Sequence, residues 1–193
     1  ALAEKRCKNF KTCGPNGDST SLSGTTAKVN NDLLFEFNKG RDALQGGKCA
    51  EVRPIVRKAV SLMTIPLVQG TIRYARYMST GQMGSDKQSE AAVFAASVLP
   101  MVHACSAADA KIIDDHTKLM DGRTSGGDAQ FTDVKAAFER NYACMGISCA
   151  DVGGLVFNSG DALNPGEYYP DAAPCVEASP PPPPSPPPSN CGG

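Results

Sequence analysis

Apolar residues recur at helical spacing through the middle of the chain, and polar or glycine-rich segments separate these stretches. The pattern predicts one helix from Asn31 to the glycine pair at 46–47, and a second from Pro54 that Pro66 is expected to kink or break. Three more helices are predicted, at about 85–105, at 106–121 and from an N-cap at Thr132. The chain is therefore expected to be mainly α, an antiparallel helical domain of about five helices.

Both ends of the chain lack this pattern. Residues 1–28 are polar, with turn-forming residues followed by a Ser/Thr run. This segment is expected to be an extended N-terminal arm, clipped by Cys7 and Cys13, although a plain surface loop fits the same composition. The segment after the last predicted helix is loop-like, with room for a short hairpin between Leu155 and Tyr169.

The chain ends in a proline-rich tail that carries a cysteine, Cys191, close to its end. Consecutive prolines favour the polyproline II conformation, which would make this stretch a stiff rod about 30 Å long. The sequence thus divides into the arm at 1–28, a disulfide-stapled helical domain at 29–175 and a polyproline II tail at 176–193.

Cysteine use indicates an oxidising compartment. The cysteines are spread over the whole chain, and no pair has the two-residue spacing of zinc-binding cysteines. A secreted protein, extracellular or in a cell wall or periplasm, is therefore expected, and the start at Ala1 would suit a mature chain whose signal peptide has been removed. The cysteines expected in disulfides are Cys7, Cys13, Cys49, Cys105, Cys144, Cys149, Cys175 and Cys191.

The pairing of these cysteines cannot be read from the sequence, with one exception. The rod of about 30 Å separates Cys175 from Cys191, whereas a disulfide needs Cα atoms within about 7 Å, so these two should not pair within one chain. Cys191 is then expected either to pin the tail across its own domain or to join the next subunit. Joining the next subunit is the preferred interpretation.

Charge and motif content make several functions improbable. The net charge is -1, with 19 basic and 20 acidic residues, so no surface for nucleic acid or anionic membranes is expected. No apolar run approaches the roughly 20 residues of a transmembrane helix, so no membrane insertion is expected. Since no nucleophile, base and orienting group stand at a recognisable spacing, an enzyme is not expected.

Oxygen donors near the end of the domain are the main candidate metal ligands. Glu167, Tyr168, Tyr169 and Asp171 follow closely on one another, and such donors suit hard cations such as ferric iron or calcium. His116, which follows two aspartates, is a further candidate. The competing explanations are a tyrosine-rich turn that packs on the domain and a solvated helix face around His116. We therefore expect no cofactor, with ferric iron as the alternative.

The serine and proline residues of the tail suit covalent O-linked glycans. No Asn-x-Ser/Thr sequence is present, which excludes ordinary N-linked glycosylation. Unmodified proline is the alternative. The candidate sites are Ser179, Pro180, Pro181, Pro182, Pro183, Pro184, Ser185, Pro186, Pro187, Pro188 and Ser189.

Two resemblances to green algal proteins add to this picture. The tail resembles the rods of hydroxyproline-rich glycoproteins of green algal walls and extracellular matrix, which implies hydroxylated and glycosylated prolines. Over about residues 50–175, the domain resembles the secreted iron-assimilating periplasmic proteins of green algae, in the stretches Val68–Tyr74, Leu99–Cys105 and Phe138–Cys175. The second resemblance implies iron assimilation but supplies no ligand residues.

Two functions follow as expectations. The first is a secreted structural glycoprotein, a subunit of a fibril or of a cell-wall or matrix assembly, in which the arm and the tail join identical subunits head to tail. The alternative is a monomeric periplasmic iron-binding protein. Assembly is preferred because a proline-rich tail that ends in a thiol needs an anchor, and iron capture provides none.

Overall fold

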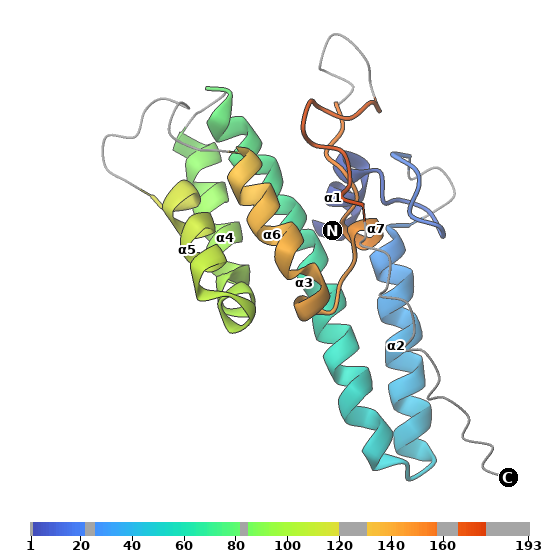
Figure 1. Ribbon diagram of the computed structural model, residues 1–193. Helices are drawn as coiled ribbons and strands as arrows, with labels where there is room; N and C mark the ends of the chain where they lie inside the picture. The colour runs from blue at the N-terminus through green and yellow to red at the C-terminus, as the bar shows by residue number, and fades with distance from the viewer. Residues whose placement is uncertain (1, 22–25, 82–84, 120–130, 158–165, 177–193) are drawn as a thin grey trace, which may run out of the picture.

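The computed structural model describes residues 2–21, 26–81, 85–119, 131–157 and 166–176 (Figure 1). Over these residues the protein is mainly α, with β structure only as isolated bridges. The helices are α1 (Leu2–Phe10), α2 (Lys28–Gln45), α3 (Cys49–Ser79), α4 (Ser85–Cys105), α5 (Ala107–Thr117), α6 (Phe131–Met145) and α7 (Cys149–Val152). The predicted mainly α, disulfide-stapled fold is thus confirmed.

Helix α3 organises the molecule. It is 31 residues long and packs against α1, α2, α4, α6 and α7. Its first half pairs with α2 in an antiparallel arrangement, the α2–α3 hairpin, which projects from the rest of the molecule in Figure 1. Its second half packs with the remaining helices to form what is here called the body. In the body, α4, α5 and α6 lie on one side of α3, and α1 and α7 lie on the other.

A continuous hydrophobic core fills the body. It is built from apolar positions of each helix, which meet around the second half of α3. Among its fully buried side chains are Phe10 of α1, Leu62 and Val68 of α3, Val98 of α4 and Phe138 of α6. Because α3 belongs to both the core and the hairpin, packing in the body fixes the direction in which the hairpin projects.

The N-terminal segment is not the extended arm or surface loop that its composition predicts. Residues 2–10 form α1, and Cys7 and Phe10 are buried in the core. The disulfide between Cys7 and Cys13 ties the end of α1 to the turns that follow. A helix this short is not stable in water by itself, so its docking on the core, which composition does not reveal, stabilises it.

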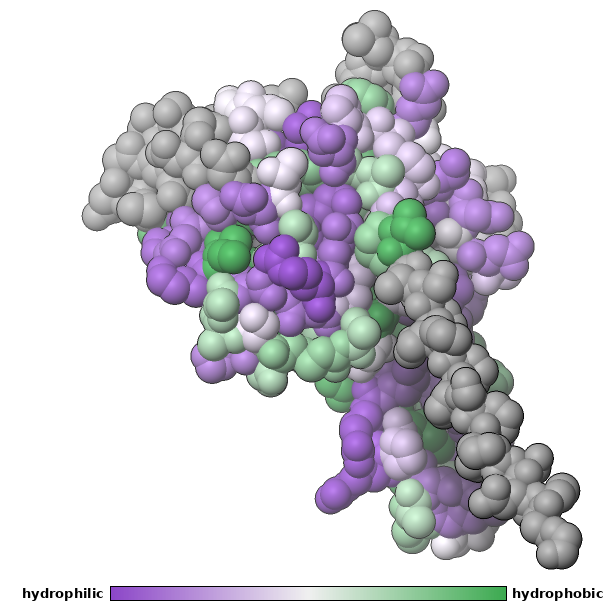
Figure 2. All heavy atoms as spheres, in the orientation of Figure 1, coloured by the Kyte–Doolittle hydropathy of each residue, from purple (hydrophilic) through white to green (hydrophobic). Residues whose placement is uncertain are grey.

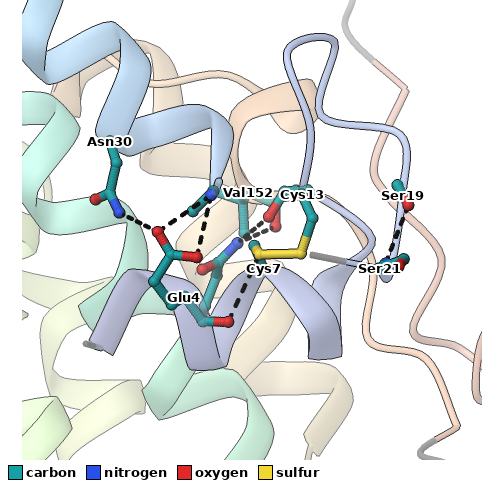
Figure 3. Close-up of a disulfide and its surroundings, with 10 residues drawn as sticks. Glu4, Cys7, Cys13, Ser19, Ser21, Asn30 and Val152 are labelled. Atoms are coloured by element: carbon teal, nitrogen blue, oxygen red, sulfur yellow. Dashed lines mark hydrogen bonds between the residues drawn. A yellow bond between two sulfur atoms is a disulfide. The ribbon is translucent and has the colours of Figure 1, made fainter. Parts of the chain in front are cut away.

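Polar contacts fasten α1 and the residues after it to the other helices (Figure 3). The Glu4 carboxylate accepts hydrogen bonds from the backbone N–H of Ala27 at 3.3 Å and from Asn30 Nδ2 at 2.5 Å. Beside the disulfide, the buried amide of Gln69 donates from Nε2 to the carbonyl oxygen of Val152 at 2.8 Å. These bonds join α1, α2, α3 and α7 where the hairpin meets the body.

Pro66 does not break the second predicted helix. Helix α3 runs without interruption past both Pro54 and Pro66. A proline inside a helix removes one backbone hydrogen bond, but the Pro66 ring is buried in the body, where its packing offsets that loss. Of the two outcomes expected at Pro66, a kink or a break, the break does not occur, because tertiary packing outweighs the local preference.

The helix starts are predicted with unequal accuracy, since α2 begins at Lys28, three residues before the expected Asn31, and α3 begins at Cys49, five residues before the expected Pro54. Helix α4 has the predicted bounds, and the Ser106 side chain caps α5 by accepting a hydrogen bond from the Asp109 N–H at 3.2 Å. Helix α6 begins at Phe131, so the expected N-cap Thr132 lies inside the helix. Helix α7 was not predicted, since its four residues are too few for a periodic pattern.

The short hairpin predicted after the last helix is present in the described residues around it. Val156 forms an antiparallel bridge with Tyr168. The Phe157 N–H donates to the Glu167 carbonyl at 2.8 Å, and the Tyr169 N–H donates to the Leu155 carbonyl at 3.0 Å. The hairpin therefore holds the segment 166–176 against the body.

Candidate functional site

An apolar groove, here called the hairpin groove, runs between the two helices of the α2–α3 hairpin. It encloses about 520 Å³. Its lining comes from Glu36, Phe37, Gly40, Arg41, Leu44 and Gln45 of α2 and from Val52, Ile55, Val56, Ala59, Val60 and Met63 of α3.

Large apolar side chains of the groove face solvent. Phe37 and Leu44 of α2 are 58% and 59% exposed, and Val56 and Met63 of α3 are 53% and 56% exposed. Complete burial of such a side chain stabilises a protein by about 1.5–3 kcal/mol, and most of that gain is missing here. Contiguous exposed apolar surface of this kind usually marks a binding site. None of the described helices combines the length and apolarity that a bilayer-spanning segment needs.

The α3 wall of the groove is a stripe that continues to a free thiol. At about 100° per residue, Cys49, Val52, Val56, Val60 and Met63 fall within about 80° of one another around the helix. The Cys49 side chain is exposed, and its thiol forms no disulfide with any cysteine of the described residues. The thiol therefore lies at the end of the groove wall that is farthest from the body.

The opposite side of α3 faces the body. Lys58 lies about 180° around the helix from Cys49, and its Nζ donates a hydrogen bond to the Gly146 carbonyl at 3.2 Å. Gly146 begins the connection from α6 to α7, and α7 starts at Cys149, which is bonded to Cys175. The root of the tail is thus on the side of α3 that faces away from the groove.

Charged side chains near the groove pair with one another. Arg41 lies 2.9 Å from the Asp42 carboxylate, and Lys48 lies 3.8 Å from that of Glu51. Exposed pairs of this kind add little to stability. The lining itself contains one acidic side chain, Glu36, and one basic side chain, Arg41, and is otherwise mainly apolar, so an apolar ligand is expected.

Three disulfides account for six of the cysteines: Cys7–Cys13, Cys105–Cys144 and Cys149–Cys175. Because Cys175 is bonded to Cys149, the prediction that Cys175 does not pair with Cys191 is confirmed. Cys49, also expected in a disulfide, has no partner within the described part of the chain. Cys191 lies outside the described residues.

The structure does not bring the candidate metal ligands together. His116 lies on α5, whereas the other four candidates lie on the segment 166–176, and Figure 1 shows these two regions on different sides of the body. Among the described residues, no three His, Cys, Asp or Glu side chains are grouped so that they could hold a metal ion. Of the metal ligands predicted from the sequence, only those of the segment 166–176 lie near one another.

The two tyrosines of that segment are engaged in packing. The Tyr169 ring lies 4.1 Å from the Phe157 ring and 5.2 Å from the Arg76 guanidinium, as measured between centres. The Tyr168 ring lies 5.7 Å from Lys11 Nζ. Successive residues of a strand point to opposite faces, so the two phenols diverge instead of converging on one ion.

The buried arginine of α1 has a structural role. Burial, reinforced by nearby Arg73, lowers the pKa of the Arg6 guanidinium. This guanidinium lies 5.5 Å from the ring centre of Tyr74 on α3 and 5.6 Å from that of Phe94 on α4. These cation–π contacts join three helices.

Sequence reasoning missed the hairpin groove, although a signal for it exists. The apolar residues at 33, 34, 35 and 37 span about 200° around α2. A single neighbouring helix cannot cover so wide an arc, so some of these side chains had to remain exposed. The tail with its candidate glycosylation sites, from Ser179 to Ser189, lies outside the described residues.

No protein-family model, curated protein or solved structure matches this chain.

Proposed function

We propose that this chain is a secreted structural glycoprotein, a subunit that assembles with identical copies into an extracellular fibril, wall layer or matrix. The observation that carries the proposal is the hairpin groove, with its half-exposed Phe37, Leu44, Val56 and Met63 on a projecting hairpin. Contact with another subunit would remove this apolar surface from water, which favours association.

Two further features support the proposal. Three disulfides fit an oxidising, extracytoplasmic compartment. The tail consists mostly of proline and serine, a composition that suits a glycosylated spacer between domains.

The test is the size and appearance of the purified full-length chain. Sedimentation velocity at rising protein concentration and electron micrographs should show oligomers or filaments. Val60→Asp places an unpaired carboxylate in the groove and should leave the protein monomeric, because a buried charge without a partner is costly. Val93→Asp is the matched control, since Val93 is an exposed valine on α4, outside the groove, and this variant should assemble normally. A wild-type protein that stays monomeric at every concentration, without filaments, rules out the proposal.

Ferric iron binding is the alternative, favoured by the resemblance of residues 50–175 to iron-assimilating proteins. Its candidate donors are the exposed carboxylates of Glu167 and Asp171 together with Tyr168. A bound ion should raise the melting temperature, and Glu167→Gln with Asp171→Asn should abolish the rise. If ferric citrate leaves the melting temperature unchanged and no iron copurifies, this alternative fails.

A further inference from the structure

We propose that the hairpin groove binds the proline-rich tail of a second copy of this chain, and that Cys49 then forms a disulfide with Cys191 of that copy. The inference rests on the proposed function and names the contact through which its subunits join.

The tail has the composition that the groove requires. From Ala178 to Asn190 it carries no charged side chain and consists mainly of proline. Polyproline II segments bind apolar grooves with aromatic walls, and they lose little conformational entropy because the rod is already extended. Phe37 of α2 is the aromatic side chain of this groove, and Leu44 together with the valines of α3 supplies the remaining apolar wall.

The tail and the groove also match in length. The α3 wall from Val52 to Met63 spans about 17 Å, and the prolines within 180–188 span about 28 Å as polyproline II. Cys191 closely follows the last proline, and Cys49 lies one helical turn before Val52. A tail that runs along the groove toward the tip of the hairpin therefore brings the two thiols together.

The three disulfides of the structure involve neither Cys49 nor Cys191. Six of the cysteines are paired with one another, and Cys49 is exposed and free at the end of the groove wall. The remaining cysteine of the sequence is Cys191. Exposed free thiols seldom persist in an oxidising compartment, so a link between these two cysteines is expected there.

The tail of the same chain starts on the wrong side of α3 to enter its own groove. It begins after Cys175, which the bond to Cys149 holds beside the connection from α6 to α7. Lys58 contacts Gly146 of that connection from the side of α3 opposite Cys49. The four residues 176–179 that precede the first proline reach at most about 14 Å, and the proline rod after them is too stiff to curve around a helix about 10 Å wide. The groove therefore receives the tail of a second copy.

This arrangement gives an assembly that can grow without closing. Each chain carries one donor, the tail, and one acceptor, the groove, so the contact is head to tail. A polyproline II rod has three residues per turn, so one row of prolines can face the groove while the other two rows stay available for sugars. Docking and glycosylation of the tail are thus compatible.

Formation of the disulfide needs an oxidant, and a low-molecular-weight disulfide such as glutathione disulfide serves. The Cys191 thiolate attacks one sulfur of glutathione disulfide, that sulfur–sulfur bond breaks, and one glutathione leaves as a thiolate. The Cys49 thiolate then attacks the Cys191 sulfur of the mixed disulfide and releases the second glutathione. The two protons from the cysteine thiols are taken up by the two glutathione thiolates.

The test mixes two full-length variants in a glutathione redox buffer. Cys49→Ser keeps only the tail thiol, and Cys191→Ser keeps only the groove thiol, so a link between Cys49 and Cys191 can form only between chains. With one variant labelled with heavy isotopes, non-reducing gels and peptide mass analysis should show a heterodimer joined through Cys49 and Cys191. Its absence from the mixture overturns the proposal, as does a wild-type protein in which these cysteines are joined mainly within one chain.

The role of the groove is tested in the Cys191→Ser partner. Adding Val60→Asp should lower the rate of heterodimer formation about tenfold, whereas adding Val93→Asp should leave it unchanged. Equal rates for both overturn docking in the groove. Filaments formed by wild type and retained by the double variant Cys49→Ser/Cys191→Ser would overturn the disulfide link and leave the proposed function standing.

Discussion

At the scale of single residues, Gly153 is the tightest position at the junction of α1 and α7. It ends α7 with φ +70°, and an added Cβ would lie 2.2 Å from the Phe10 carbonyl oxygen and 2.6 Å from Thr12 Cγ2. Gly153→Ala should lower the free energy of unfolding by about 2–4 kcal/mol, through both backbone strain and the clash with backbone atoms. Urea denaturation measures this loss.

Gly47 provides the control for that substitution. It has the same φ, +70°, but an added Cβ would meet nothing within 4 Å. Gly47→Ala should therefore cost only the strain of a left-handed alanine, about 1 kcal/mol. Gly153 also has ψ -164°, a backbone conformation that is essentially restricted to glycine. Equal losses at the two positions would show that local movement at Gly153 relieves both the clash and this extra strain.

Asp109 couples the stability of the body to pH. Its carboxylate accepts hydrogen bonds from Arg140 Nε at 3.1 Å and from Asn141 Nδ2 at 2.8 Å. The bond from the Arg140 guanidinium, more than any other contact, holds the pKa of Asp109 below its ordinary value. A lowered pKa in the folded state gives stability that is fully present above the unfolded pKa of about 4 and is lost as the pH falls through the folded pKa.

Asp109→Asn should therefore destabilise the protein at pH 7, and the difference from wild type should shrink below about pH 4. We expect a loss of about 1 kcal/mol at pH 7, because Arg140 is half exposed and solvent weakens its pairing. Thermal unfolding at pH 7 and pH 3 measures both values. If Asp109→Asn lost the same stability relative to wild type at pH 7 and at pH 3, the charge of Asp109 would not contribute to the stability of the fold.

At the scale of helices, two interior glycines should respond in opposite ways to alanine. An added Cβ at Gly70 of α3 would lie 2.6 Å from the Phe94 ring of α4, whereas at Gly40 of α2 it would make an ordinary contact with Ile55 at 3.4 Å. Gly70→Ala should destabilise by about 1–3 kcal/mol, since the ring must move. Gly40→Ala should stabilise by about 1 kcal/mol through its higher helix propensity. Melting temperatures that shift in the same direction would contradict this prediction.

The sequence predicts the long helices well because their apolar positions repeat over many turns. It fails where a few long-range contacts decide the outcome. Helix α1 is too short and too polar to be predicted from its sequence, because its stability comes from the burial of Phe10 in the core. Pro66 is tolerated inside α3 only because its ring is buried. The hairpin groove is missed for a related reason. A periodic pattern identifies apolar positions, but it does not reveal that no helix of the described residues covers Phe37 and Val56.

At the scale of the whole molecule, the disulfides should differ in what they contribute. Cys105–Cys144 spans 39 residues of chain and joins α4 to α6, whereas Cys7–Cys13 spans 6. On loop-closure entropy, replacing the first pair by alanine should cost about 4 kcal/mol and replacing the second about 2 kcal/mol. Urea denaturation of the two double variants tests the order. Equal losses would mean that native packing, and not loop length, sets the contribution of each bond.

The same disulfides have a mechanical consequence. In a fibre joined from Cys49 to the tail, a pulling force would follow the covalent chain from Cys49 to Cys105, cross to Cys144, continue to Cys149 and cross again to Cys175. The segments 106–143 and 150–174 lie outside this path and bear no tension. Under load, the tension is carried by the chain between Cys49 and Cys105, by the few residues between Cys144 and Cys149 and by the tail after Cys175, so the disulfides Cys105–Cys144 and Cys149–Cys175 would cap how far each subunit stretches.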